Sequence, residues 1–184
     1  CHYGLYNARN GGLPTNSVIG TVMSNIGLEL ALKKENINLI RTKVGDRYVS
    51  DELRRTGAIV GGEKSGHIIL SRHTTTGDGM ITALQILTIM VKTGKKLSEL
   101  ASEMEEFPQL LVNIPVKERD GWDEKEEIIS AIRKVEEKLK GVGRVVVRPS
   151  GTEKLIRVMA EGPDQEELEE LVGYIADIIK DVMG

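Results

Sequence analysis

The sequence predicts two domains. The first is a mixed α/β domain with helices packed on a four-stranded sheet, and the second is a small α+β domain with helices on one face of a mainly antiparallel sheet. Short β-branched runs alternate with helical runs over residues 17–91, which is typical of an α/β sheet. Two apolar runs enclose a turn rich in Ser, Gly and Thr at 145–159, which indicates a hairpin. A polar link at 115–121 separates the two patterns.

The domain limits follow from that link. We expect the α/β domain over 15–113 and the α+β domain over 114–184. Residues 1–14 begin without Met and are polar and Gly-rich, with no apolar periodicity. We therefore expect them to be a linker or the end of a preceding domain.

The first domain alternates strands with helices. Strands are expected at 17–22, 38–44, 58–60 and 68–70, and helices at 26–34, 47–56, 80–91 and 97–106. The first strand, helix and strand form a βαβ unit, which favours parallel pairing. Asn25 and Asp78 precede helices and are the expected N-caps. A metal loop is the alternative at Asp78, but one carboxylate is too few for Mg²⁺. Because 80–91 is apolar on most faces, we expect that helix to be buried.

The second domain follows a different pattern. It has an extended run at 110–114, an amphipathic helix over 122–140, the hairpin, and a last helix opened by the capping box of Asp164 and Glu167. Apolar stripes around Ile128 and Ile175 could bind a partner helix, which would make this an interaction domain. A core role explains the same stripes more simply.

Composition restricts the classes of function. The net charge is -3 and the pI is ≈ 5.7, and aromatic residues are scarce, so nucleic-acid binding is disfavoured. Cys1 is the single cysteine, which leaves no internal disulfide or thiolate metal cluster and favours a reducing, cytoplasmic location. No apolar run approaches the roughly 20 residues that a membrane-spanning helix needs.

The turn between the two apolar runs of the hairpin is a candidate anion site. Gly151 permits a positive φ, so successive backbone N–H groups can form a concave nest. Ser150 and Thr152 add hydroxyl groups, and Arg148 adds a guanidinium suited to bidentate contact with phosphate. Arg157, on the following strand, can add charge. A solvated Ser/Thr turn is the structural alternative.

A second candidate site lies in the first domain, in a glycine-flanked loop. Glu63 accepts hydrogen bonds and Ser65 both donates and accepts them, a combination suited to adjacent hydroxyls of a sugar. His67 is a candidate proton carrier or phosphate partner. A hairpin with a solvated polar tip is the alternative. A further contact loop is expected where a strand ends, formed by Lys43, Gly45, Asp46 and Arg47.

Several runs resemble those of the α-D-phosphohexomutases. Arg148 to Glu153 is similar to their phosphate-binding loop, Arg-Pro-Ser-Gly-Thr-Glu-Pro, with Lys154 in place of the last Pro. Gly62 to His67 is similar to their sugar-binding loop, Gly-Glu-Gln-Ser-Gly-His, with Lys64 in place of Gln. The resemblance is strongest to the bacterial branch that interconverts the 6- and 1-phosphates of glucosamine, whose third domain has runs similar to 20–27 and 42–48.

The resemblance implies the third and fourth of four domains. The whole enzyme would move a phosphoryl group between a phosphoserine and either end of the sugar phosphate, with Mg²⁺ and a hexosamine 1,6-bisphosphate intermediate that also serves as activator. The sequence has no Ser-His-Asn run for the phosphoserine and no Asp-x-Asp-x-Asp-Arg run for the metal. We therefore expect no metal ligand here, the missing N-terminal domains as partners, and no turnover by this piece alone. A homo-oligomer is left open.

The resemblance also implies residue roles. Glu63 and Ser65 would hold two sugar hydroxyls, and His67 would lie near the reacting end. The phosphate that is not reacting would be clamped by Arg148, Ser150, Gly151 and Thr152. Because contacts to hydroxyls do not read the group at carbon 2, phosphomannomutase and phosphoglucomutase activities stay open. So does a non-catalytic phosphosugar-binding module.

Overall fold

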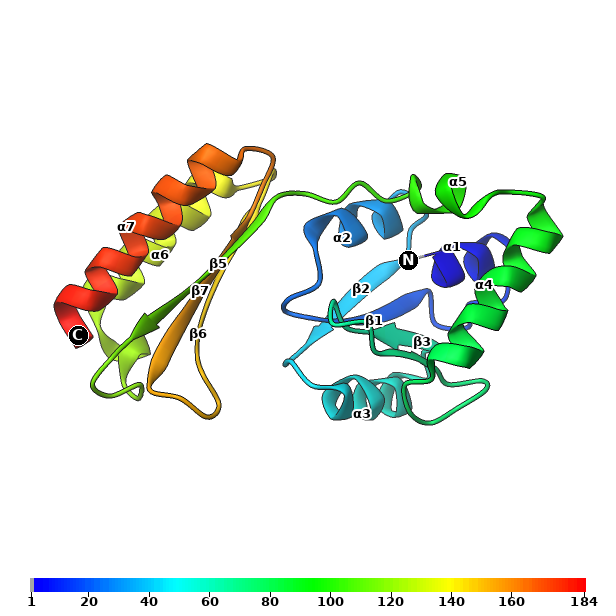
Figure 1. Cartoon of the computed structure of the whole chain (residues 1–184), viewed down its shortest axis with the longest axis horizontal. Coiled ribbons are helices and arrows are strands. Elements are labelled where there is room, and N and C mark those ends of the chain that lie inside the picture. Colours follow the sequence, from blue (N-terminus) through cyan, green and yellow to red (C-terminus); the bar gives the residue numbers. More distant parts are fainter. Residues whose placement is uncertain (1) are drawn as a thin grey trace. The chain divides into compact units, whose positions relative to one another are not determined.

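The computed structural model describes residues 2–184 and divides the chain into two compact units, unit 1 up to Glu106 and unit 2 from Phe107 (Figure 1). The sequence placed the domain limit after residue 113, but the structure places it after Glu106. The reason is that the extended run after 108 pairs with a strand of the second unit, so it belongs to that sheet. Among the described residues, no helix is both long and apolar enough to cross a membrane.

Unit 1 is built on a four-stranded mixed sheet, which confirms the predicted fold class. Its strands are β1 (Ser17–Thr21), β2 (Asn38–Thr42), β3 (Val60–Gly62) and β4 (Ile68–Leu70), in the order β2-β1-β3-β4. β1 lies parallel to β2 and β3, and β4 is antiparallel to β3. The third strand was expected at 58–60, but it begins at Val60 because Gly61 and Gly62 pair with β4.

Helices cover both faces of this sheet. They are α1 (His2–Arg9), α2 (Ile26–Lys33), α3 (Asp46–Thr56), α4 (Gly79–Thr93) and α5 (Leu97–Ala101). Consecutive residues of β1 point to opposite faces, so Ile19 packs with α3 residues and Val18 packs with residues of α1, α2 and α4. The result is a three-layer α/β/α arrangement (Figure 1). Asn25 and Asp78 cap α2 and α4, as predicted.

The start of the chain is helical, which corrects the expectation of a linker over 1–14. Tyr3 and Leu5 of α1 are buried in the core of unit 1. Arg9, at the end of α1, pairs with Glu35 and with Glu103. Cys1 lies outside the described residues. The apolar residues of α1 are too few for a clear period in the sequence, so the helix depends on tertiary packing.

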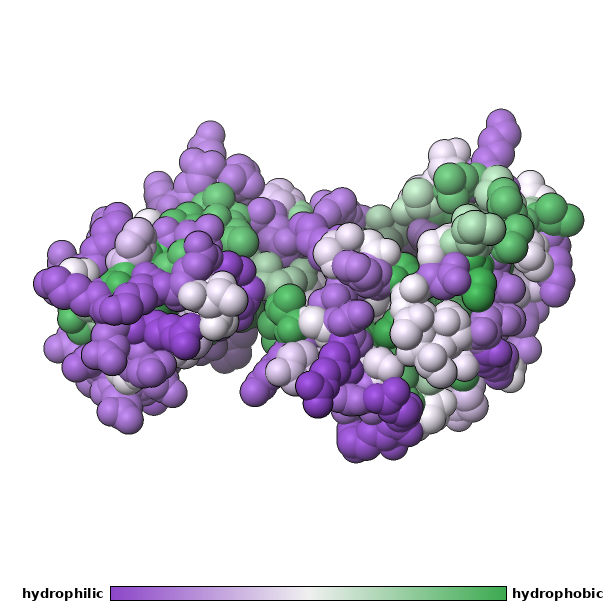
Figure 2. Space-filling view, turned by 60° about the horizontal axis from the view of Figure 1, so that its bottom comes forward, coloured by the Kyte–Doolittle hydropathy of each residue, from purple (hydrophilic) through white to green (hydrophobic). Residues whose placement is uncertain are grey.

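The long apolar helix is the second correction. α4 was expected to be buried, but Ile89 is its only buried residue. Ile81, Ile86 and Met90 are partly buried beside it. One stripe of α4 is exposed, with Met80 at 78% and Val91 at 84%. Hydrophobic residues accordingly gather on the part of the surface where α4 lies (Figure 2). The sequence pattern could not distinguish a covered face from an uncovered one.

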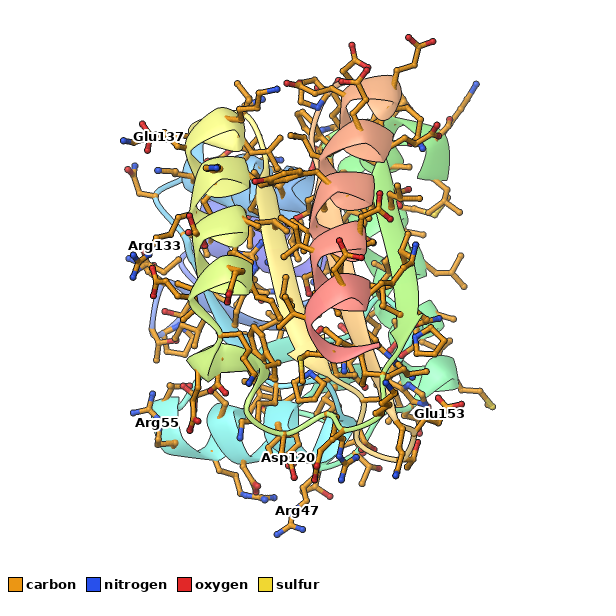
Figure 3. All side chains as sticks on the ribbon, turned by 90° about the vertical axis from the view of Figure 1, so that its left-hand side faces the viewer. Arg47, Arg55, Asp120, Arg133, Glu137 and Glu153 are labelled. Carbon is orange, nitrogen blue, oxygen red and sulfur yellow. The ribbon has the colours of Figure 1, made fainter. Side chains whose placement is uncertain are left out.

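Unit 2 has a three-stranded antiparallel sheet in the order β5-β7-β6, with two helices on one face (Figure 3). Its elements are β5 (Gln109–Pro115), the 3-10 turn η1 (Trp122–Glu124), α6 (Glu126–Leu139), β6 (Arg144–Pro149), β7 (Leu155–Glu161) and α7 (Gln165–Met183). The single helix expected over 122–140 is therefore two elements. Ile128 and Ile175 are fully buried together in the core, which confirms the core role of both stripes.

A buried carboxylate sits where all three strands of this sheet meet. Glu161 of β7 is 0% exposed and accepts hydrogen bonds from Arg144 of β6 at 2.5 Å and from Gln109 of β5 at 2.8 Å. Both partners lie directly opposite Glu161 in the strand register. A buried charge is tolerated only when it is paired in this way. The pairing therefore fixes the register of both neighbouring strands.

We predict that Glu103 gives unit 1 an acid-sensitive contribution to stability. Burial acts to raise its pKa, but hydrogen bonds from Lys95 and Arg9 outweigh it and lower the pKa to about 2 from the usual 4.5. A depressed carboxyl pKa stabilises the fold at pH above about 4.5, and this contribution is lost as the pH falls toward 2. Glu103→Gln should lower the free energy of unfolding by about 1–2 kcal/mol at pH 7, since solvent screens part of these pairs.

Urea unfolding followed by circular dichroism at several pH values measures this difference. The gap between wild type and Glu103→Gln should close between pH 4.5 and 2. Glu137→Gln, at an exposed position on α6, is the control and should leave the stability nearly unchanged. A gap that stays constant down to pH 2 would contradict the prediction.

Candidate sugar and phosphate sites

The candidate residues of unit 1 come from two loops that follow parallel strands. One loop follows β2 and contains Gly45, and the other follows β3 and contains Glu63. Because β2 and β3 flank β1 in the sheet, the two loops emerge on either side of the end of β1. The chain runs from β1 to β2 on one side and then crosses to β3 on the other side of β1. Open α/β sheets form binding crevices at such a change in strand order.

Glu63 joins the two loops. Its side chain is only 9% exposed, and its Oε1 accepts a hydrogen bond of 2.8 Å from the backbone N–H of Gly45. Gly45 has a φ of 132°, a backbone conformation that residues other than glycine rarely adopt. The sequence predicted both residues as candidates, but it did not predict that they bind each other. Glu63 therefore has a positioning role in addition to any contact with a ligand.

Ser65 and His67 lie in a tight turn beyond Glu63. The N–H of Glu63 donates to the carbonyl of His67 at 2.9 Å, and the N–H of Gly66 donates to the carbonyl of Glu63 at 3.1 Å. Within this turn, Ser65 Oγ and His67 Nδ1 are 3.1 Å apart, and Glu63 Oε2 lies 3.9 Å from the same nitrogen. A carboxylate, a hydroxyl and an imidazole are thus grouped at one surface, which we call the hydroxyl site. It offers both donors and acceptors to a polyhydroxy ligand.

The other predicted contacts of unit 1 lie farther out. Asp46 accepts from the backbone N–H of Arg47 at 2.8 Å, and the Arg47 guanidinium is 86% exposed and 3.8 Å from Asp51. Lys43 is exposed as well. Asp46 and Arg47 begin α3 and interact within its first turns, and Lys43 precedes the helix, so the structure brings only Gly45 of this loop to Glu63. Lys64, the residue that departs from the family run, lies 3.6 Å from Glu106.

A cavity of about 280 Å³ lies beside Glu63 and is mostly apolar. Its lining includes Leu28, Ile86 and Met104, whereas Ser65, His67 and Gly45 do not line it. Glu63 lines the cavity together with other polar residues, among them Thr82 and Glu106. The hydroxyl and imidazole groups of the turn lie outside it, so the hydroxyl site meets the cavity only at Glu63.

The hairpin of unit 2 places two arginines directly opposite each other. Arg148 of β6 and Arg157 of β7 are paired in the register, so both point to the sheet face that the helices leave uncovered. The Arg148 guanidinium has no hydrogen-bond or ion-pair partner among the described residues. Arg157 Nη2 lies 3.5 Å from Glu153 Oε2, but its Nε is buried without a partner. Burial and, secondly, the Arg157 charge lower the pKa of Arg148. Two like charges held together in this way favour an anion between them.

The loop that joins these strands has an ordered inner side. Ser150 is 2% exposed, its N–H donates to the carbonyl of Leu155, and its Oγ accepts from the N–H of Glu153. The Ser150 side chain thus shapes the loop in this structure, and its role as a phosphate ligand stays a prediction. Gly151 and Thr152 are exposed. Within the described residues, their backbone N–H groups have no hydrogen-bond partner.

Arg119 is a residue of this site that the sequence did not reveal. Its Nη1 donates to the carbonyl of Ser150 at 2.7 Å and to the carbonyl of Gly151 at 2.9 Å. The residue lies in the polar link before α6, 31 residues from Ser150 in the sequence. Because the contact is to backbone atoms, no residue pattern at either end indicates it. We call Arg148, Arg157, Arg119 and residues 150–152 the phosphate loop.

Comparison with known families agrees with this geometry. A family model for "Phosphoglucomutase/phosphomannomutase, alpha/beta/alpha domain III" matches residues 3–107, and a model for the C-terminal domain of the same family matches residues 111–178. The chain belongs to the phosphoglucomutase/phosphomannomutase family. The two matched segments correspond to unit 1 and unit 2, and each contains one of the two sites described above.

Individual members of the phosphoglucomutase/phosphomannomutase family are also similar. The phosphoglucosamine mutase of Lactobacillus helveticus is 50% identical over 98% of this chain, and that of Heliobacterium modesticaldum is 54% identical over 96%. The chain spans 40% and 38% of the lengths of these relatives. Among solved structures, Aspergillus fumigatus N-acetylphosphoglucosamine mutase has a TM-score of 0.83 at 20% identity, covering 99% of this chain and 42% of its own. At that identity the likeness confirms the fold.

We predict that Glu63 stabilises the loop after β2 of this family member. Glu63→Ala removes the acceptor of the Gly45 N–H and leaves a partly buried donor unpaired, which should lower the free energy of unfolding by about 1–3 kcal/mol. Urea unfolding measures the loss, and amide hydrogen exchange at Gly45 should become faster.

Ser65→Ala is the matched control from the same turn. Its hydroxyl is exposed, so the stability should change by less than about 0.5 kcal/mol and the exchange of Gly45 should stay slow. If Glu63→Ala behaved like Ser65→Ala in both measurements, the bridging role of Glu63 would be wrong.

Proposed function

We propose that this chain is the sugar- and phosphate-binding part of a phosphoglucosamine mutase. In the whole enzyme it would bind glucosamine 6-phosphate, glucosamine 1-phosphate and the bisphosphate between them. The phosphate loop would clamp the phosphate that is not reacting. The hydroxyl site would hold the sugar, with Glu63 and Ser65 as its partners and His67 near the reacting end.

The opposed arginines carry the phosphate assignment. Arg148 and Arg157 face each other, Arg148 has no counterion among the described residues, and the buried Arg157 Nε lacks a partner although its Nη2 lies 3.5 Å from Glu153. A phosphate dianion offers three acceptor oxygens, which can satisfy both guanidinium groups and the free N–H groups of Gly151 and Thr152. A neutral ligand would leave the charge of Arg148 uncompensated. A solvated Ser/Thr turn would not bring the second arginine into register with the first.

Phosphoryl transfer itself needs groups that we assign to other domains. Within residues 2–184, no three His, Cys, Asp or Glu side chains are grouped so that they could hold a metal. One solved relative is described in complex with GlcNAc-6P and magnesium, and another with glucose 1,6-bisphosphate. We propose that Mg²⁺ and the phosphoserine belong to the preceding domains of the intact enzyme. This chain would then fix the geometry of the substrate by binding its remote phosphate.

The choice of hexose follows from the relatives. Several proteins at about half identity over nearly the whole chain are phosphoglucosamine mutases. Glucose or mannose phosphates are the alternatives within the family, because the hydroxyl site does not read the group at carbon 2. The other alternative is a phosphosugar-binding module without turnover.

One experiment tests the proposal. The full-length gene product is assayed with glucosamine, glucose and mannose 6-phosphates, and kcat/KM should be highest for glucosamine 6-phosphate. Arg148→Ala should lower kcat/KM for every sugar by about 10- to 100-fold, because a charge-assisted hydrogen bond contributes about 1.5–3 kcal/mol.

Arg133→Ala is the matched control. This arginine projects from α6 into solvent, so the assay should not change (Figure 3). A preference for glucose or mannose phosphate would support the corresponding alternative, and tight binding without turnover would support the module. Full activity of Arg148→Ala would show that the loop does not clamp the phosphate.

A further inference from the structure

The exposed stripe of α4 is the most extended hydrophobic helix face on unit 1. Met80, Leu84, Leu87 and Val91 follow each other at helical spacing and are 53–84% exposed. The stripe is about 16 Å long, given a rise of 1.5 Å per residue. From Gly79 to Val91 the helix contains no charged residue. Such a surface is costly to leave in water, which makes the stripe a candidate contact site.

The area of the stripe argues against an independent partner. Full burial of one aliphatic side chain contributes about 1.5–3 kcal/mol, which at about 25 cal/mol per Å² corresponds to about 60–120 Å² of surface. Because the four side chains are 53–84% exposed, together they present about 200–300 Å². Stable complexes between separate molecules bury about 800 Å² on each partner. A membrane surface is also disfavoured, because amphipathic membrane helices have basic residues along their polar face, and the only charged residue of α4 is Lys92 in its last turn.

A tethered domain can use so small a surface. A covalent link gives an effective concentration in the millimolar range, so few contacts suffice. The relatives are more than twice as long as this chain, and the first matched segment is domain III of the family. α1, the first described helix, packs against α4, so a domain joined before α1 would be held beside this stripe.

We propose that the stripe of Met80, Leu84, Leu87 and Val91 docks the domain that precedes domain III in the same polypeptide. The docked surface must itself be apolar, since α4 offers no charge for pairing along these residues. This inference rests on family membership and on exposure. It does not depend on the proposed activity.

Thiol labelling tests the docking directly. Leu84→Cys is made in a Cys1→Ser background, both in this chain and in the full-length gene product, and the reaction with a water-soluble maleimide is timed. Labelling of Leu84→Cys should be at least about tenfold slower in the full-length protein, because reactivity follows exposure. Val142→Cys, at a half-exposed apolar position in unit 2, should react equally fast in both.

Two results would overturn the proposal. Equal labelling of Leu84→Cys in both proteins would show that nothing covers the stripe. A second copy would be the occupant if labelling of the isolated chain slowed as its concentration rose and sedimentation showed dimers.

Arg119 carries a second, independent inference. None of the described peptide bonds is cis, so the N–H of each peptide group points opposite to its C=O. Arg119 binds the carbonyls of Ser150 and Gly151, which fixes two successive peptide groups. The N–H groups of those peptides belong to Gly151 and Thr152, so both are turned away from Arg119 and toward free space. Gly151 does not take up the positive φ that the sequence allowed, so the loop is a turn in which these two adjacent N–H groups share one orientation; such a pair can bind an anion, and we call it the nest.

We infer that Arg119 is a positioning residue that holds the nest open before a ligand arrives. The role rests on the proposed phosphate loop. Without Arg119, the exposed peptides at Gly151 and Thr152 could rotate, and the cost of ordering them would be added to every binding event. A lysine could reach a carbonyl but lacks the planar fork, so it should restore the order only in part.

Amide NMR of this chain tests the role with inorganic phosphate as the probe. In Arg119→Ala, the ligand-free amides of Gly151 and Thr152 should shift and show lower order parameters, and phosphate affinity should fall about tenfold. Arg119→Lys should lie between Arg119→Ala and wild type, and Arg133→Ala should match wild type. Arg148→Ala should lose affinity while these ligand-free amides keep their wild-type order.

The two proposals can fail separately. A wild-type loop that binds no phosphate would contradict the phosphate assignment, whereas the order parameters would still report on Arg119. Unchanged amide signals in ligand-free Arg119→Ala would overturn the positioning role.

Discussion

The buried ion pair of Glu161 and Arg144 is the constraint on which the phosphate loop depends. Because strand side chains alternate with a period of two, a slip of one residue between β6 and β7 would move this carboxylate away from its partner. An unpaired buried charge costs about 3–5 kcal/mol, a large part of the stability of a small domain. The register that pairs Glu161 with Arg144 also pairs Arg157 with Arg148 at the other end of the hairpin. The Glu161–Arg144 pair thus also sets the register of Arg148 and Arg157, the two candidate phosphate-binding arginines.

Much of this fold could be predicted from the sequence, for local reasons. The caps Asn25 and Asp78, the parallel β1–β2 pair and the hairpin all follow from patterns within a few residues of each other. The errors concern contacts that no local pattern encodes. α1 forms because its few apolar residues meet a distant sheet, and β5 belongs to unit 2 because it pairs with β7, whose partner residues lie 40 or more positions later. The exposed face of α4 had the same apolar sequence that a covered face would have.

The candidate sites show the same division. Side-chain chemistry indicated Glu63, Ser65, His67 and Arg148 as candidates, because carboxylate, hydroxyl, imidazole and guanidinium groups suit a phosphosugar. The supporting contacts were not visible. Glu63 binds a backbone N–H, and Arg119 binds backbone carbonyls, so neither interaction depends on the identity of the residue it reaches. The sequence therefore indicated the candidate side chains but not the backbone contacts that hold their loops in place.

The make-up of the phosphate loop has a consequence for selectivity. Its donors are guanidinium groups and backbone amides, which bind phosphate oxygens in general and do not distinguish one phosphorylated molecule from another. Free orthophosphate and unrelated monoesters would thus compete for the loop, and the cell contains both. In the proposed arrangement, discrimination between phosphorylated molecules would have to come from the groups around Glu63 and not from the phosphate loop.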